Sequence, residues 1–412
     1  MSIPPPMISI DIFTTTSIVF SMRTTNYISI LILVFFAQSL TPRVGSIVSS
    51  QPVVLPNYNL LDINRVNISP NGKLLIRGNL GGNFRLYSLS GPGGSKISDY
   101  ARDEDSGEYY VMPFFSQGGR YNVLNSALQA NDFADLGRLH VIDTHTNTSS
   151  LTVNTKLRGF VGTNFTNMNW PSIFDFSADE TMLAYTDNGK NLIVYDLAGQ
   201  KQIVAIALNE PYYTTAITFH PSGKFIATKS GDKGQITLWE IATKKQIAVF
   251  TDPNDYDMSD SNWLDEKTVR FSNDGRYLIT FSTLNYLYYV WDVSMRRLII
   301  HDFFLTAQIR SSPANNFMAI GNIIFNQQTK KTQTLNIGNY PGYVAVAFSP
   351  DDKFIALTGG DGIYVFDTST FTQVGQAPLP GGRYVSAMAF SDTNNFYAVS
   401  SSGQVSYVSI HE

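Results

Sequence analysis

The sequence predicts an all-β chain built from eight copies of one four-stranded unit. From Val66 onwards, short stretches alternate apolar and polar residues and are rich in β-branched and aromatic side chains, which is the pattern of strands. Tight-turn pairs such as Asn71-Gly72, Ser222-Gly223 and Asp274-Gly275 lie between these stretches. No stretch shows a helical period, so strands are the only elements that we expect.

The first strand of each copy ends at a serine or histidine just before a turn, which we call the marker residue. The markers are Ser69, Ser116, Ser177, His220, Ser272, Ser312, Ser349 and Ser391, spaced 37 to 61 residues apart. A repeat of about 40–45 residues with four strands is typical of a β-propeller, in which each repeat forms one blade.

The third strand ends in an aromatic residue followed by an acid in four copies, and in Ile142-Asp143 in a fifth. In chain order the third strands read FRLYSL, LHVIDT, LIVYDL, ITLWEI, YYVWDV, IIFNQQ, IYVFDT and VSYVSI. The sixth, from Ile323, lacks the aromatic–acid ending, and the second copy carries an insertion at Leu124–Arg138. If either copy is misread, the alternative is seven blades.

Closure of the ring is predicted from the two ends of the repeat region. The eighth copy stops after its third strand, whereas the apolar segment Gln51–Leu55 precedes the first copy without a partner. Pairing this segment with the last blade would leave no open edge. We therefore expect residues 47–412 to form a single closed β-propeller of four-stranded antiparallel blades.

The repeats resemble those of WD40-type β-propellers over about residues 50–412. The resemblance rests on Trp-Asp-like pairs at the ends of third strands and on aspartates in the turns after second strands. The pairs are Trp291-Asp292, Trp239-Glu240, Tyr195-Asp196, Phe366-Asp367 and Ile142-Asp143, and the turn aspartates are Asp187, Asp232 and Asp361. The family's Gly-His pair is absent, so its Asp-His-Ser-Trp tetrad cannot form in full. The chain is thus similar to divergent WD40 or YVTN-like propellers, which implies a rigid binding scaffold.

Residues 1–46 are predicted to be a targeting segment. The apolar run 27–40 fits the core of a signal peptide and is shorter than the roughly 20 residues of a membrane span. Ala37-Gln38-Ser39 forms a small-x-small cleavage site, and Met22 is the start from which the pattern is most compact. We expect a secreted or surface-exposed protein. The alternatives are an uncleaved membrane anchor and an intracellular scaffold with a misplaced start.

The connections that enter each blade carry most of the sequence variety, and most place an aromatic residue just before the new inner strand. Aromatic and arginine side chains provide most binding energy at protein interfaces. The partner-binding candidates are Tyr109, Tyr110, Arg158, Trp170, Tyr212, Tyr213, Trp263, Tyr343, Arg383 and Tyr384. Each aromatic ring could instead cap the packing between two blades.

Composition limits the other classes of site. The net charge of −4 argues against a nucleic-acid surface, and the absence of cysteine excludes disulfides and thiolate metal sites. Asp255, Asp257, Ser259 and Glu266 have the spacing of a calcium loop, but Asp260 stands where such a loop needs glycine. A solvated acidic loop is the default, and no cofactor is expected.

Catalytic motifs for a nucleophile elbow, a zinc protease or a phosphate loop are absent from the sequence. We therefore expect a non-catalytic protein that binds a protein partner. A glycan-binding propeller and a propeller hydrolase or lactonase remain as alternatives. Three sequons, at Asn67, Asn147 and Asn164, are glycosylation candidates if the protein is exported.

Overall fold

The computed structural model describes residues 9–13, 17–21, 32–33, 47–55, 65–78, 83–100, 108–128, 137–154, 174–187, 190–208, 214–230, 235–251, 269–282, 287–303, 308–339, 344–382 and 384–411. The chain divides into two compact units, one holding the residues up to Ser46 and the other Ile47–His411. In the first, Ser9–Phe13 (β1), Ser17–Ser21 (β2) and Ile32–Leu33 (β3) form an antiparallel sheet in that order. No helix in the described part of the chain is long and apolar enough to span a membrane.

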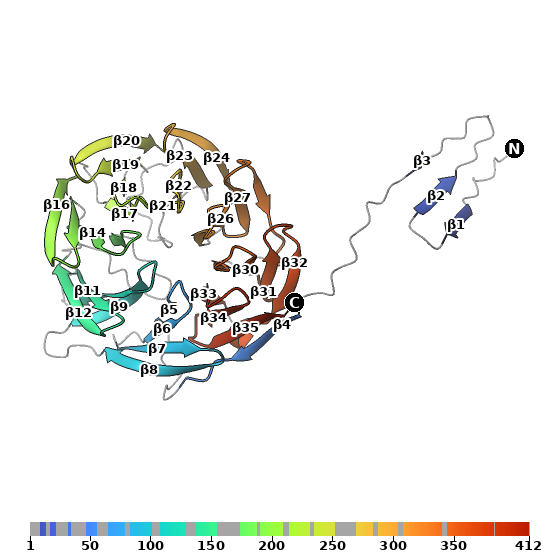
Figure 1. The fold of residues 1–412 in the computed structure, drawn as a ribbon, viewed down its shortest axis with the longest axis horizontal. Coiled ribbons are helices and arrows are strands. Elements are labelled where there is room, and N and C mark those ends of the chain that lie inside the picture. Colours follow the sequence, from blue (N-terminus) through green and yellow to red (C-terminus); the bar gives the residue numbers. More distant parts are fainter. Residues whose placement is uncertain are drawn as a thin grey trace. The chain divides into compact units, whose positions relative to one another are not determined.

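The second unit is a ring of eight four-stranded antiparallel blades (Figure 1). From the centre outwards, blade 1 contains Arg65–Ile68 (β5), Leu74–Gly78 (β6), Phe84–Ser90 (β7) and Gly93–Tyr100 (β8). Blade 2 contains Glu108–Phe115 (β9), Tyr121–Leu128 (β10), Gly137–Asp143 (β11) and Thr148–Asn154 (β12). Blade 3 contains Phe174–Phe176 (β13), Met182–Asp187 (β14), Asn191–Asp196 (β15) and Lys201–Ala207 (β16).

The next four blades follow the same order. Blade 4 contains Thr214–Phe219 (β17), Phe225–Ser230 (β18), Gln235–Glu240 (β19) and Lys245–Thr251 (β20). Blade 5 contains Val269–Phe271 (β21), Tyr277–Ser282 (β22), Leu287–Asp292 (β23) and Arg297–Phe303 (β24). Blade 6 contains Ile309–Ser311 (β25), Phe317–Ile320 (β26), Ile323–Asn326 (β27) and Thr332–Thr334 (β28). Blade 7 contains Val346–Phe348 (β29), Phe354–Thr358 (β30), Ile363–Asp367 (β31) and Gln373–Ala377 (β32).

Blade 8 is completed by the start of the propeller, which confirms the predicted closure. Val385–Phe390 (β33), Asn395–Ser400 (β34) and Val405–His411 (β35) are followed outwards by Ile47–Pro52 (β4). β4 runs antiparallel to β35, from Ser406 opposite Pro52 to His411 opposite Ile47. The closing strand therefore starts and ends earlier than the predicted Gln51–Leu55.

The rest of that predicted segment ties blade 8 to blade 1. The Val53 amide donates to the carbonyl oxygen of Val405 over 2.9 Å, and the Val54 amide donates to that of Pro92 over 3.1 Å. Leu55 packs closely on Gly94: a Cβ atom added to Gly94 would lie 2.6 Å from Cδ2 of Leu55. The closure thus consists of a strand in blade 8 and a strap onto blade 1.

The hydrophobic core lies between blades, because both faces of each sheet pack against a neighbouring sheet. Leu75 and Tyr87 of blade 1, for example, share one buried cluster with Ala389 and Tyr397 of blade 8. All five residues of β30 (FIALT) are buried, which explains why this second strand is a nearly continuous apolar run.

A β-bulge lies at one repeated position of the third strand in six blades. There the register with the fourth strand shifts just before Tyr87, Ile142, Tyr195, Trp239, Trp291 and Phe366, so the residue is aromatic in five of the six. A bulge increases the local twist of a strand pair. In these six blades the repeated position is therefore also the point at which the blade twists towards its outer edge.

The acid that follows the aromatic residue caps the turn between the third and fourth strands. In blade 7, Oδ1 of Asp367 accepts hydrogen bonds from the amides of Ser369 (2.9 Å) and Thr370 (3.0 Å). Burial acts to raise the pKa of Asp367, but these hydrogen bonds outweigh it and the pKa is lowered. Asn326 makes the same two bonds in blade 6, both 2.9 Å, so this copy is regular despite its missing acid.

Candidate functional site

The connections of the propeller open onto two opposite faces. In an antiparallel meander, successive turns alternate between the two ends of the sheet. The turns between first and second strands and between third and fourth strands form one end, which we call the turn face. The turns between second and third strands and the connections into each blade form the other end, which we call the loop face.

Three of the ten predicted partner-binding residues lie in the described part of the chain. Tyr384 is 61% exposed and immediately precedes β33 on the loop face. Tyr109 and Tyr110 lie in β9, opposite Ala127 and Ser126. The other seven lie outside the described residues: Arg158, Trp170, Tyr212, Tyr213, Trp263, Tyr343 and Arg383.

Tyr384 is held on a compact ledge beside blade 8. Its carbonyl oxygen accepts a hydrogen bond of 2.9 Å from the amide of Ser401. Just before it, Pro380–Gly382 form a 3₁₀ turn in which Gly381 has φ +59° and lies against the end of the Gln404 side chain. We call Pro380–Gly382, Tyr384 and Ser401–Gln404 the Tyr384 ledge. Its backbone contacts fix the base of an exposed aromatic side chain.

The neighbouring part of the loop face, in blade 7, is built around a turn aspartate. The Tyr364 hydroxyl donates to Oδ1 of Asp361 over 2.7 Å, and this hydrogen bond raises the pKa of Tyr364. Gly338 and Gly359 lie against the same ring, where an added Cβ would come within 2.4 and 2.5 Å of its atoms. Asp361 therefore orients a buried tyrosine. Of the other two turn aspartates, Asp187 is half-buried and Asp232 lies outside the described residues.

The predicted calcium ligands Asp255, Asp257, Ser259 and Glu266 also lie outside the described residues. Within the residues that are described, no group of three or more histidine, aspartate or glutamate side chains is placed to hold a metal ion.

Two of the three sequons are described, and both asparagines make contacts between blades through Nδ2, the atom that would carry a glycan. Asn67 donates from Nδ2 to the carbonyl oxygen of Pro113 in blade 2 over 3.1 Å. Asn147, at φ +56° in a turn of blade 2, donates from Nδ2 to the Ser98 hydroxyl of blade 1 over 2.8 Å. Asn164 lies outside the described residues.

The absence of the Gly-His pair prevents a complete Asp-His-Ser-Trp tetrad, but the hydrogen bond of its tryptophan is present in two blades. The indole Nε1 of Trp239 donates to Oγ1 of Thr228 over 2.9 Å, and that of Trp291 donates to Oγ1 of Thr280 over 3.2 Å. Both tryptophans are buried, at 8% and 6% exposure. A threonine of the second strand thus accepts the indole hydrogen bond in blades 4 and 5.

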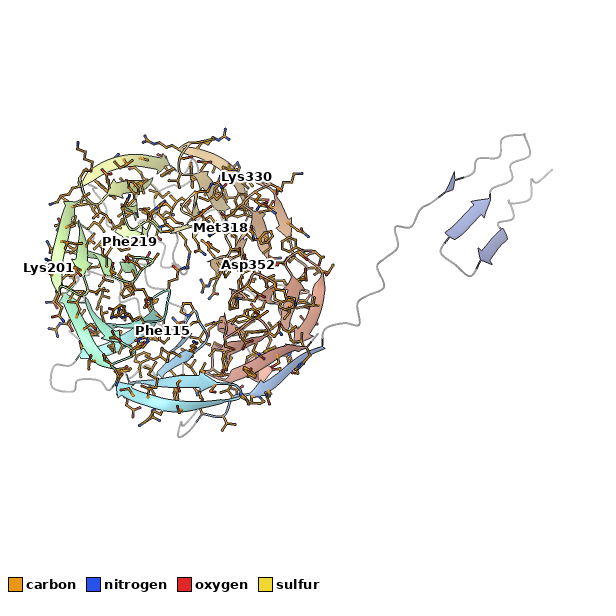
Figure 2. All side chains as sticks on the ribbon, in the orientation of Figure 1. Phe115, Lys201, Phe219, Met318, Lys330 and Asp352 are labelled. Atoms are coloured by element: carbon orange, nitrogen blue, oxygen red, sulfur yellow. The ribbon has the colours of Figure 1, made fainter. Side chains whose placement is uncertain are left out.

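A cavity of about 830 Å³ occupies the centre of the ring and is lined by the inner strands of all eight blades. The residue before the marker is a phenylalanine in six of them: Phe115, Phe176, Phe219, Phe271, Phe348 and Phe390. Figure 2 shows Phe115 and Phe219 towards the inner side of the ring and Lys201 on its outer rim. Pro70, Pro221, Pro313 and Pro350 line the cavity from the turn face.

The described lining of this cavity carries few charges. They are the cations of Lys73, Arg270 and Arg310 and the carboxylate of Asp175. Oδ2 of Asp175 accepts a hydrogen bond of 2.9 Å from the amide of Phe219 in the next blade. Arg270 and Arg310 belong to no motif of the repeat, but both stand two residues before a marker, where the inner strand borders the channel.

Comparison with known families gives a match whose position agrees with the architecture. Residues 330–363 match the family model of the WD domain, G-beta repeat. The match runs from just before β28, the outer strand of blade 6, to the first residue of β31 in blade 7. The chain is similar to WD40-repeat propellers. The predicted resemblance is thereby confirmed, and such a fold suggests a protein-interaction scaffold. A comparison with curated proteins finds no match.

The matched WD40 repeat does not coincide with one blade, and this offset also accounts for the closure. The repeat combines the outer strand of one blade with the inner strands of the next. A chain built from repeats in this phase begins with an outer strand and ends with a third strand. β4 and β35 are these two strands, and their pairing completes blade 8.

Proposed function

We propose that this WD40-like propeller is an exported, non-catalytic platform that binds a protein partner at its loop face, with the Tyr384 ledge as part of the contact surface. The observation that carries the proposal is the 61% exposure of Tyr384 on a fixed backbone. A tyrosine offers a large contact area with few rotatable bonds, so ordering it on binding costs little entropy.

The other exposed apolar side chains support this choice by contrast. Among the described residues, the exposed large hydrophobic residues are Val54, Ile97, Ile203, Met295 and Tyr384, and only the last is aromatic. Met295 lies in the turn between β23 and β24, on the turn face, and is 62% exposed. Tyr384 on the loop face and Met295 on the turn face therefore have nearly equal exposure.

This pair provides a matched test of partner binding. We expect Y384A to weaken capture of the partner from the medium or cell-surface fraction at least about tenfold. M295A should leave capture unchanged, and both variants should keep the wild-type unfolding temperature. A photo-reactive residue at position 384, but not at 295, should cross-link to the same partner. Equal capture by both variants would contradict the loop face as the binding surface.

The glycan alternative is tested in the same assay. If the captured molecule loses binding after enzymatic removal of its glycans, the ligand is a glycan and the protein-binding proposal fails. If binding survives deglycosylation and depends on Tyr384, a protein surface is recognised.

Export is supported by the order of the segments along the chain. Cleavage at Ala37-Gln38-Ser39 would remove the apolar run and leave β4, which starts at Ile47, on the mature protein. We expect N-terminal sequencing of protein from the medium or cell surface to give a start near residue 40. An intact N-terminus on protein found only inside the cell would contradict export.

A further inference from the structure

The central cavity has an apolar part in its wall. Six of the eight blades contribute a phenylalanine next to the marker; Phe115 and Phe348 are half-buried, whereas the other four are buried between the blades at 3–8% exposure. The exposed prolines Pro70, Pro313 and Pro350 add apolar surface at the turn face. The cavity volume of about 830 Å³ lies within the range of about 300–1,000 Å³ that is usual for small-molecule sites. The cavity therefore has the size and surface to enclose the apolar part of an organic molecule.

The charge of this wall is opposite in sign to that of the whole protein. The chain carries a net charge of −4, whereas the described lining of the cavity has the three cations Lys73, Arg270 and Arg310 against the single carboxylate of Asp175. A lining of this sign attracts an anion and disfavours a cation.

The two arginines lie in neighbouring blades at corresponding positions. Arg270 in β21 of blade 5 and Arg310 in β25 of blade 6 each stand two residues before their marker. The two blades touch directly at this level, since the Asn273 side chain donates from Nδ2 to the carbonyl oxygen of Ser312 over 3.2 Å. In blade 6, Ser311 stands where six other blades have the phenylalanine next to the marker.

Both arginine side chains are half-buried, so their charges are partly shielded from water. An Nη1 atom of Arg310 donates to the carbonyl oxygen of Ile309 over 3.0 Å, which holds the guanidinium close to the inner strand. Guanidinium groups form strong, paired hydrogen bonds with carboxylates, phosphates and sulfonates, and partial burial strengthens the attraction.

We propose that the central channel binds a small amphipathic organic anion, with its anionic group at Arg270 and Arg310 and its aromatic or aliphatic body against Phe115, Phe348 and the lining prolines. The site lies in the channel rather than on the Tyr384 ledge, so it does not depend on the partner-binding proposal. The same chemistry would accept a carboxylate, a sulfonate or a phosphate ester with an apolar body.

The test uses two fluorescent probes and the folded full chain. 8-Anilinonaphthalene-1-sulfonate is an aromatic anion, and N-phenyl-1-naphthylamine is its neutral counterpart. We expect the anion to bind with one-to-one stoichiometry. The double variant R270Q/R310Q should weaken binding of the anion at least about tenfold and leave binding of the neutral probe within about threefold.

Two controls separate charge from structure. R270K/R310K keeps both positive charges and should bind the anionic probe within about threefold of wild type. K201Q removes an exposed lysine of the outer strand β16 and should change nothing. All variants are first compared by thermal unfolding.

If R270Q/R310Q fails to fold, the salt dependence of the wild-type protein decides. Raising the sodium chloride concentration from about 0.05 M to about 0.5 M should weaken binding of the anionic probe several-fold and leave binding of the neutral probe unchanged. No saturable binding of the anion, equal binding by wild type and R270Q/R310Q, or equal salt dependence of the two probes would each overturn the proposal.

Discussion

His220 donates a hydrogen bond from Nε2 to the carbonyl oxygen of Gly275 in the next blade, over 3.2 Å. On the other side of the ring, Nδ1 accepts from the amide of Ser222 over 3.1 Å. Only the neutral imidazole with its proton on Nε2 satisfies both bonds, because a proton on Nδ1 would face the Ser222 amide. Burial lowers the pKa of His220 from its usual 6.5, which agrees with this assignment.

We predict that His220 makes the protein less stable in mild acid. Above pH 6.5 the imidazole is neutral in both folded and unfolded chains and adds no pH dependence. As the pH falls below 6.5, the unfolded chain takes up the proton first, so the free energy of unfolding decreases. H220S restores the marker residue of the other seven blades. The difference between wild type and H220S, measured by urea unfolding from pH 8 to pH 4.5, should shift in favour of H220S below pH 6.5. A pH-independent difference would contradict the assignment.

The contact with Gly275 gives a second prediction. Gly275 has φ +72°, and a Cβ there would lie 2.0 Å from Nε2 of His220. G275A should therefore destabilise the wild-type protein by the cost of the backbone conformation, about 1 kcal/mol, and by the additional steric clash. In the H220S background only the backbone cost should remain. Equal destabilisation in both backgrounds, measured as a double-mutant cycle, would show that the two residues do not interact.

The two tryptophans of the WD40-like motif are predicted to stabilise the core rather than to bind a ligand. W239A or W291A should lower the free energy of unfolding by about 3–5 kcal/mol, because each removes a buried ring. T228V should cost about 1–3 kcal/mol, because it leaves the buried Trp239 indole without its acceptor. Urea unfolding measures each value, and a near-neutral W239A would contradict the packing described for blades 4 and 5.

Much of the fold could be predicted because each blade repeats the same local signals. Alternating apolar residues recur in every blade, and so does the turn after the marker. The marker is a serine in seven blades because its hydroxyl forms hydrogen bonds within that turn. Oγ of Ser177, for example, donates to Asp179 over 2.6 Å and accepts from the Met182 amide over 2.9 Å. The apolar pattern predicts a closing strand later in the chain than β4, because the residues of β4, IVSSQP, include few apolar side chains. The pairing of β4 is decided by the open edge of β35, which lies far away in the sequence.

The candidate sites were harder to predict because their residues follow no period. The exposure of Tyr384 depends on the ledge around Gly381 and Gln404, two residues that are distant in sequence. Arg270 and Arg310 occupy positions of inner strands that read as ordinary alternation. Only the closure of the ring brings such positions together around one channel. The sequence therefore indicated which face varies, whereas the charge of the channel followed from the structure.

Closure by β4 gives a prediction for the stability of the whole ring. Deleting residues 48–52 should lower the unfolding temperature strongly, because β35 loses its partner and blade 8 its outer strand. Deleting residues 2–46, which leaves β4 intact, is the control and should change the unfolding temperature little. G94V should destabilise by about 1–3 kcal/mol by displacing Leu55 of the strap. If the 48–52 deletion unfolds at the wild-type temperature, β4 does not close the ring.

Asp352 gives the last prediction, because a buried carboxylate stands where four other blades have glycine. It is 7% exposed and has φ +61°. Its Oδ2 accepts from the amide of Ala314 in blade 6 over 2.9 Å, whereas Oδ1 has no hydrogen-bond partner. Burial raises the pKa of Asp352 above its usual 3.8, so ionisation opposes folding.

The sign of the effect follows from the raised pKa. Below pH 3.8 the carboxyl is protonated in both states, whereas at pH 7 the folded protein must bury a charge. D352N keeps an oxygen acceptor for Ala314 and removes the charge. It should therefore stabilise the protein by about 1–2 kcal/mol at pH 7, and the gain should shrink towards pH 3. Unfolding by urea at pH 3, 5 and 7 measures this gain. A gain that does not increase with pH would mean that the ionised carboxylate is well accommodated between blades 6 and 7.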